Sequence, residues 1–107
     1  MMEIEMSEGA IQKVIAAKLK KAGWLVSTFP APNGWPDIRA FGGLRTMLIE
    51  VKRKGKKPSE LQQYHIDEFR KKGYEVYVLD DTKEIDKIIK MTLADVNYYK
   101  NKTYKND

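Results

Sequence analysis

Two carboxylates and a lysine stand out in this sequence because their types and spacing suit chemistry on phosphate esters. Asp37 follows Pro36, and after twelve intervening residues comes the run Glu50-Val51-Lys52. Mg²⁺ and Mn²⁺ take oxygen ligands and keep bound waters for chemistry, so Asp37 and Glu50 are candidate metal ligands. The Lys52 ammonium would hold an attacking water or stabilise the charge that grows in the transition state. The set therefore predicts metal-assisted phosphodiester hydrolysis.

The burial expected for the strand that carries Glu50 and Lys52 distinguishes a functional role from a surface role for these residues. Glu-x-Lys on a strand is also a common exposed charged pair, and Pro-Asp is a common turn dipeptide. Leu48, Ile49 and Val51 instead mark this strand as largely buried. A charged residue on such a strand is unusual unless it has a function or a partner. The pattern therefore favours the functional interpretation.

Apolar spacing and the positions of glycine and proline predict an α/β fold with the element order αβββαβ. Because a helix separates the third strand from the fourth, we expect these two strands to be parallel, joined by a right-handed crossover. The sheet is then mixed and flanked by helices. The predicted elements are a helix over 7–22 capped by Ser7, strands over 24–29, 38–41 and 46–52 with a hairpin turn at Gly42-Gly43, a helix over 59–72 and a strand over 74–79.

The last part of the chain is predicted to be helical and then frayed. A third helix should start at Asp81 or Thr82 and run through Lys90, and Thr92 with Asp95 resembles a capping box for a short last turn. From about Lys100 we expect a frayed polar tail.

Length and composition bound the remaining choices. A chain of 107 residues fits one domain over residues 1–107, and its net charge of +5 favours a polyanionic partner. There is no cysteine, which excludes disulfides and thiolate zinc sites. The N-terminal segment carries Glu3, Glu5 and Glu8 where a signal peptide needs basic residues, and no apolar run is long enough to span a membrane. We therefore expect a soluble cytoplasmic protein with no membrane partner.

Four motifs along the chain form one pattern: Gly34-Trp35-Pro36-Asp37, Ile49-Glu50-Val51-Lys52, Ser59 followed by Gln62, and Gly73 before the last core strand. In these residues the chain resembles the VRR-NUC domains of the PD-(D/E)xK nuclease superfamily. The likeness extends over about residues 7–80. It implies a restriction-endonuclease-like αβββαβ core, metal binding by Asp37, Glu50 and the backbone carbonyl of Val51, and a catalytic Lys52.

Two further site residues follow from the same resemblance, since many members place an acidic residue on the first helix and a glutamine on the second. Here these positions point to Glu8 and Gln62. Glu8 shares a helical stripe with Ile11, and Gln62 shares one with Ile66, so both polar groups would face the sheet. The alternatives are a Glu8 carboxylate that offsets the helix dipole and a Gln62 that is solvated in the first turn.

The predicted function is a Mg²⁺- or Mn²⁺-dependent DNA endonuclease that favours branched DNA. Cutting two strands needs two active sites, which a chain of this size supplies most simply as a homodimer or a larger even-numbered assembly. The basic run Arg53, Lys54, Lys56 and Lys57 would grip phosphates, and Trp35 is either a loop anchor or a contact to an exposed base. The alternative is a nucleic-acid-binding protein with the same fold and no cleavage activity.

Overall fold

The computed structural model describes residues 5–103, which form four helices and one four-stranded sheet. None of these helices is long and apolar enough to cross a membrane. The elements in chain order are α1 (Glu8–Lys21), β1 (Leu25–Ser27), β2 (Ile38–Phe41), β3 (Thr46–Val51), α2 (Glu60–Lys71), β4 (Glu75–Leu79), α3 (Glu84–Lys90) and α4 (Leu93–Thr103).

The sheet has the strand order β1-β2-β3-β4 and is mixed, as predicted. β1, β2 and β3 pair antiparallel, whereas β4 pairs parallel with β3 through the α2 crossover. The β2–β3 hairpin turns through Gly42, whose N–H donates to the Arg45 carbonyl at 2.8 Å, and Gly43, which has a φ of 78°. A positive φ is readily adopted only by glycine, which explains why the hairpin forms here.

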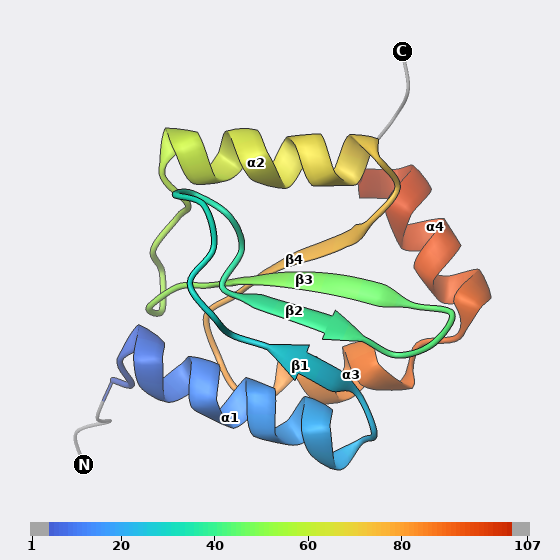
Figure 1. Ribbon diagram of the computed structural model, residues 1–107, viewed down its shortest axis with the longest axis horizontal. Coiled ribbons are helices and arrows are strands. Elements are labelled where there is room, and N and C mark those ends of the chain that lie inside the picture. The colour runs from blue at the N-terminus through green and yellow to red at the C-terminus, as the bar shows by residue number, and fades with distance from the viewer. Residues whose placement is uncertain (1–4, 104–107) are drawn as a thin grey trace.

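Helices lie on both faces of the sheet, so the domain has three layers (Figure 1). α1 and α3 cover one face, where the larger core includes Ile15, Leu19, Ile49 and Ile85. α2 covers the other face, where Ile66 packs with Leu48 and Val76. Alternate residues of β3 therefore point into two different cores, which is the reason for its nearly unbroken apolar sequence.

The helix N-termini follow the predicted signals, but the last helix is longer than expected. The Ser7 hydroxyl accepts from the Ala10 N–H at 3.1 Å, and Thr92 and Asp95 form the predicted reciprocal pair at 3.1 and 3.0 Å. α4 then continues to Thr103, whereas a short turn and a frayed tail from Lys100 were expected. The rest of that tail, residues 104–107, lies outside the described residues.

Tertiary packing explains the length of α4. Val96 is buried, the Tyr99 ring lies 4.9 Å from the Tyr77 ring, and the Tyr99 hydroxyl donates to the Val76 carbonyl at 3.1 Å. These contacts dock the helix beside β4. A polar sequence that would fray by itself is helical here because packing supplies most helix stability in proteins.

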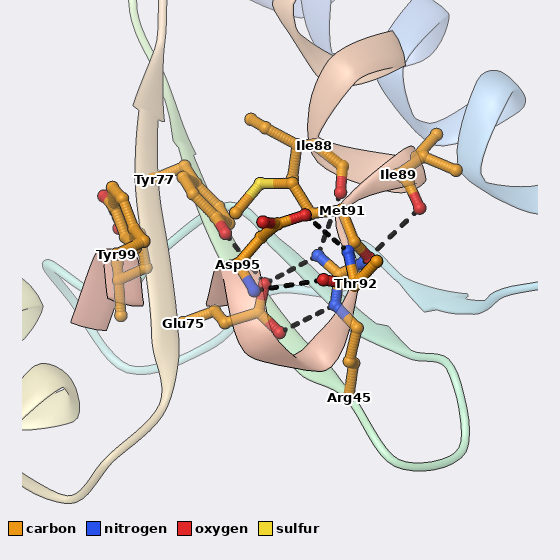
Figure 2. A network of polar contacts seen from close by, with 10 residues as sticks. Arg45, Glu75, Tyr77, Ile88, Ile89, Met91, Thr92, Asp95 and Tyr99 are labelled. Atoms are coloured by element: carbon orange, nitrogen blue, oxygen red, sulfur yellow. Dashed lines mark hydrogen bonds and ion pairs between the residues drawn. The ribbon is translucent and has the colours of Figure 1, made fainter. Parts of the chain in front are cut away.

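A buried ion pair fixes the ends of β3 and β4 that lie farthest from Asp37 and Glu50 (Figure 2). Arg45 binds both carboxylate oxygens of Glu75 at 2.8 and 3.1 Å, and Glu75 also accepts from the Tyr77 hydroxyl at 2.8 Å. The same guanidinium donates to the backbone carbonyls of Ile88, Ile89 and Met91 at the end of α3. This network ties the β2–β3 turn to the α3 helix.

Candidate metal centre

Asp37 and Glu50 meet at the edge of the sheet where β2 begins and β3 ends. The last paired residues of the β2–β3 ladder there are Ile38 and Ile49, so one step further along places Asp37 across from Glu50. The Asp37 Oδ2 accepts a hydrogen bond of 2.9 Å from the Val51 N–H. The loop before β2 thus delivers its carboxylate directly to the strand that carries the second one.

Glu50 is buried, and most of its surroundings disfavour its charge. Its side chain is 1% exposed, and its Oε1 atom has no hydrogen-bond partner. Burial, together with hydrogen bonding and repulsion from Asp37, raises the pKa of Glu50 to about 8, although Lys52 acts in the opposite direction. The Glu50 side chain is therefore mostly protonated at neutral pH while the metal is absent.

Lys52 continues β3 beyond its last ladder residue and is half-buried. Its backbone N–H donates to the Leu79 carbonyl at 2.9 Å, which fixes the main chain beside β4. The ammonium lies near enough to lower the pKa of Glu50. Since residues two apart on a strand share a face, Glu50 and Lys52 point to the same side of the sheet, toward α2.

The donor set fits a hard divalent cation. Two carboxylates lie side by side, and the buried Glu50 Oε1 lacks a partner. A cation would satisfy that atom and remove the repulsion that raises the Glu50 pKa. Within residues 5–103, no group of three or more His, Cys, Asp or Glu side chains is arranged to hold a metal. Metal binding here would therefore need main-chain oxygen and water in addition to Asp37 and Glu50.

Glu8 approaches the same end of β3 from the α1 side of the sheet. Its Oε2 accepts from the Arg53 N–H at 3.4 Å, and its charge is the smallest of the named contributions that raise the Glu50 pKa. The Glu8 side chain is exposed. The fold thus brings Glu8 to the neighbourhood of the two carboxylates, and its part in catalysis stays a prediction.

Gln62 has a structural partner that the sequence analysis did not assign. Its Oε1 accepts from the Ser59 N–H at 2.9 Å, and the Ser59 hydroxyl accepts from the Gln62 N–H at 3.2 Å. This is a capping box at the start of α2, and the Ser-x-x-Gln spacing signals it in the sequence. A role for Gln62 in catalysis stays a prediction, and the side chain would have to leave the cap to take it up.

The loop that ends at Asp37 packs against α2. The ring of Trp35 makes an edge-to-face contact of 4.9 Å with the ring of Phe69. Gly34 has a φ of 86°, and a Cβ there would come within 2.7 Å of Leu61 and 3.0 Å of His65. Of the two roles considered for Trp35, the contact with Phe69 is that of a loop anchor.

Arg39 is a residue of this region that the sequence analysis missed. It is half-buried on β2 and donates to the Pro36 carbonyl at 2.9 Å and to the Phe29 carbonyl. The only signal in the sequence was an arginine between the apolar residues Ile38 and Ala40, two positions after Asp37.

The basic run beside the site is exposed and has few internal partners. Its members Arg53, Lys54, Lys56 and Lys57 are all on the surface of the loop that follows Lys52. Arg53 lies 3.8 Å from Glu5, an exposed pair of small energetic value. This loop is shaped by Gly55, whose N–H donates to Asp80 at 3.1 Å.

Comparison with known proteins supports the fold through solved structures. No family model matches the sequence, and no curated protein sequence matches it. One solved structure, described as a VRR_NUC domain, has 28% sequence identity and a TM-score of 0.69, and the match covers 78% of this chain and 96% of that one. A second, described as a VRR_NUC domain protein, has 19% identity and a TM-score of 0.69, covering 80% and 87%. The second match shows likeness of fold alone.

Proposed function

This chain is a VRR-NUC domain, a nuclease-type domain of the PD-(D/E)xK superfamily, and from that premise we propose that it is a metal-dependent DNA endonuclease. The observation that carries the proposal is the buried Glu50 carboxyl group, which has an unpartnered oxygen and lies across from Asp37. A protein that only binds a polyanion gains nothing from two carboxylates directed at phosphate.

Each residue of the site has a distinct task in the proposed reaction. Asp37 and Glu50 would hold Mg²⁺ or Mn²⁺, with the Val51 carbonyl as a further ligand. When bound, the metal supplies Lewis acidity and a water of lowered pKa. Glu50 must first lose its proton, since ligation requires the carboxylate. The Lys52 ammonium would orient the attacking water or neutralise charge on the phosphoryl oxygens.

Substitution of the two carboxylates tests the proposal. Supercoiled plasmid and four-way DNA are incubated with Mg²⁺ or Mn²⁺ and with wild type, Asp37→Asn or Glu50→Gln. Both variants should lose cleavage by orders of magnitude while keeping the far-UV circular dichroism of the wild type. Glu68→Gln is the matched control, because Glu68 is a partly exposed α2 residue that forms an ion pair with Lys71 at 3.3 Å. Full cleavage by Asp37→Asn or Glu50→Gln would reject the site.

We extend the proposal to the substrate, which we take to be DNA of branched shape recognised without a base sequence. The helices and strands of residues 5–103 all belong to the sheet and the layers packed on it, so no separate base-reading module is present within these residues. Phosphate contacts by the exposed basic run of residues 53–57 would give binding that weakens steeply with salt. Equal cleavage of linear and four-way DNA would contradict the branch preference.

Self-association is part of the proposal because a branched duplex must be cut on two strands. An exposed apolar surface over the β1–β2 end of the sheet supports it. Leu25 and Phe41 are direct cross-strand partners and are 72% and 46% exposed, and Leu44 in the following turn is 87% exposed. A second copy would cover this surface in a homodimer or larger even-numbered assembly. Sedimentation of a monomer at working concentration would contradict this part.

The rival proposal is a nucleic-acid-binding protein that retains the fold without cleaving. It predicts DNA binding that is the same with Mg²⁺ and with EDTA, and no nicking by the wild type. The endonuclease proposal predicts nicking that EDTA abolishes and Mn²⁺ restores. The plasmid experiment above therefore separates the two.

A further inference from the structure

Arg39 holds both ends of the loop that carries Asp37. This loop leaves β1 after Ser27 and returns to β2 at Ile38. At the start of the loop, Arg39 Nη2 donates to the Phe29 carbonyl and lies 3.4 Å from the Ser27 hydroxyl. At the second end, Arg39 Nη1 binds the Pro36 carbonyl at 2.9 Å. One guanidinium thus links the two ends of the ten-residue loop formed by residues 28–37.

The contact with Pro36 acts directly on Asp37. The Pro36 carbonyl belongs to the same planar peptide group as the Asp37 nitrogen, so fixing that oxygen fixes the plane from which the Asp37 side chain projects. Pro36 itself is buried and has a restricted φ. The Asp37 carboxylate then reaches the Val51 N–H at 2.9 Å. A short chain of rigid links therefore connects the Arg39 guanidinium to this carboxylate.

The opposite side of the loop is held separately by α2. Gly34 lies against Leu61 and His65, and Trp35 contacts Phe69. These contacts place the tip of the loop but do not touch the Pro36–Asp37 peptide. Arg39 does contact that peptide, through the Pro36 carbonyl, and its two-pronged donor geometry serves two carbonyls at once, which a lysine does not match.

We propose that Arg39 is a positioning residue that sets the Asp37 carboxylate against the end of β3 in readiness for a divalent cation. The proposal deepens the proposed function and rests on it for the identity of the cation. The guanidinium is occupied by backbone oxygens, so its task is to orient Asp37. Contact between Arg39 and DNA phosphate is the competing role, and the experiment includes it.

The experiment compares wild type, Arg39→Lys, Arg39→Met and the reference variant Asp37→Asn in cleavage, in DNA affinity measured in EDTA, and in two further measurements. The first is the ¹H–¹⁵N signal of the Val51 amide in metal-free protein, which reports the Asp37–Val51 hydrogen bond. The second is Mn²⁺ affinity from the electron paramagnetic resonance of free Mn²⁺. Arg39→Met should move the Val51 signal toward that of Asp37→Asn and weaken Mn²⁺ binding about 10- to 100-fold, as is typical when a ligand loses its support. Arg39→Lys should fall between.

Arg70→Met is the matched control, because Arg70 on α2 also donates to a backbone carbonyl, that of Val76 at 2.8 Å, and its second hydrogen bond is to the Tyr99 hydroxyl of α4. It should leave the Val51 signal and Mn²⁺ affinity unchanged. If Arg39→Met fails to fold, Arg39→Lys carries the comparison. An unmoved Val51 signal and wild-type Mn²⁺ affinity would overturn the proposal, and lower DNA affinity alone would assign Arg39 to phosphate contact. Since the Val51 measurement needs no metal, it tests Arg39 even if the wild type neither binds Mn²⁺ nor cleaves.

Discussion

Binding of a divalent cation at neutral pH should release nearly one proton from Glu50. Burial, hydrogen bonding and repulsion from Asp37 raise the pKa of Glu50 to about 8 in the metal-free protein. A group with that pKa is about 90% protonated at pH 7 and about 10% protonated at pH 9. Ligation requires the carboxylate, so cation binding must displace the remaining proton. The expected release is about 0.9 proton at pH 7 and about 0.1 at pH 9.

Isothermal titration calorimetry measures this release directly. Mn²⁺ or Mg²⁺ is titrated into the protein in several buffers of equal pH and ionic strength that differ in ionisation enthalpy. The slope of the observed enthalpy against ionisation enthalpy equals the number of protons released. Glu50→Gln is the control, because the amide has no proton to lose. A slope near zero for the wild type at pH 7, with cation binding intact, would refute the assignment of Glu50 as a buried, protonated ligand.

The same raised pKa predicts how the stability of the metal-free protein depends on pH. The unfolded chain loses the Glu50 proton near the ordinary pKa of 4.5, whereas the folded protein keeps it up to about 8. Between these values the folded state binds more protons, so stability falls as the pH rises. The full shift corresponds to about 5 kcal/mol, an upper limit for this one group. Urea denaturation of wild type and Glu50→Gln from pH 4 to 9 should show the fall only in the wild type.

Three other outcomes follow from single residues. Lys52→Ala should abolish turnover and leave Mn²⁺ affinity largely intact, because the ammonium is placed for chemistry. Calorimetry measures the Mn²⁺ affinity and single-turnover cleavage measures the chemical step. A main effect on affinity would contradict this role. Gln62→Ala should lower the free energy of unfolding by about 1 kcal/mol, since it breaks the capping box with Ser59; Gln62→Glu, which can rebuild the box, should not. Arg45→Met should cost about 3 to 5 kcal/mol in urea denaturation, because it leaves the Glu75 carboxylate buried without its cation. Wild-type stability of Arg45→Met would show that the pair contributes little.

The order of the core elements could be predicted because each is specified by nearby residues. Ser7 and Ser59 cap helices, Gly42 and Gly43 turn the hairpin, and the observed strand β2 has the predicted bounds. Strand β1 is shorter than predicted, ending at Ser27 instead of Phe29. The Phe29 carbonyl binds Arg39 instead of a strand neighbour, a tertiary contact that no local pattern reveals.

The two carboxylates and the lysine could be found from spacing, but their energetics could not. Sequence places Asp37 at the entry to one strand and Glu50 on the next, without showing that one Glu50 oxygen is buried and unpartnered. The capping role of Gln62 could have been predicted from Ser59 three residues earlier. The family resemblance instead led to a prediction that Gln62 belongs to the active site. Arg39 was invisible because its partners are backbone carbonyls, which every residue carries.

The two ends of the central strands differ in whether their buried charged groups have partners. At the start of β3 and β4, Arg45 and Glu75 are buried and satisfied by the Tyr77 hydroxyl and by carbonyls of α3. At the far end of β3, the Glu50 carboxyl is equally buried but lacks a partner on one oxygen. An unsatisfied buried acid is costly in a domain whose net stability is small, so it persists only where the rest of the fold is secure. Satisfied ionic contacts at one end therefore offset the cost of the unpartnered Glu50 oxygen at the other, which under the proposed function a cation would satisfy.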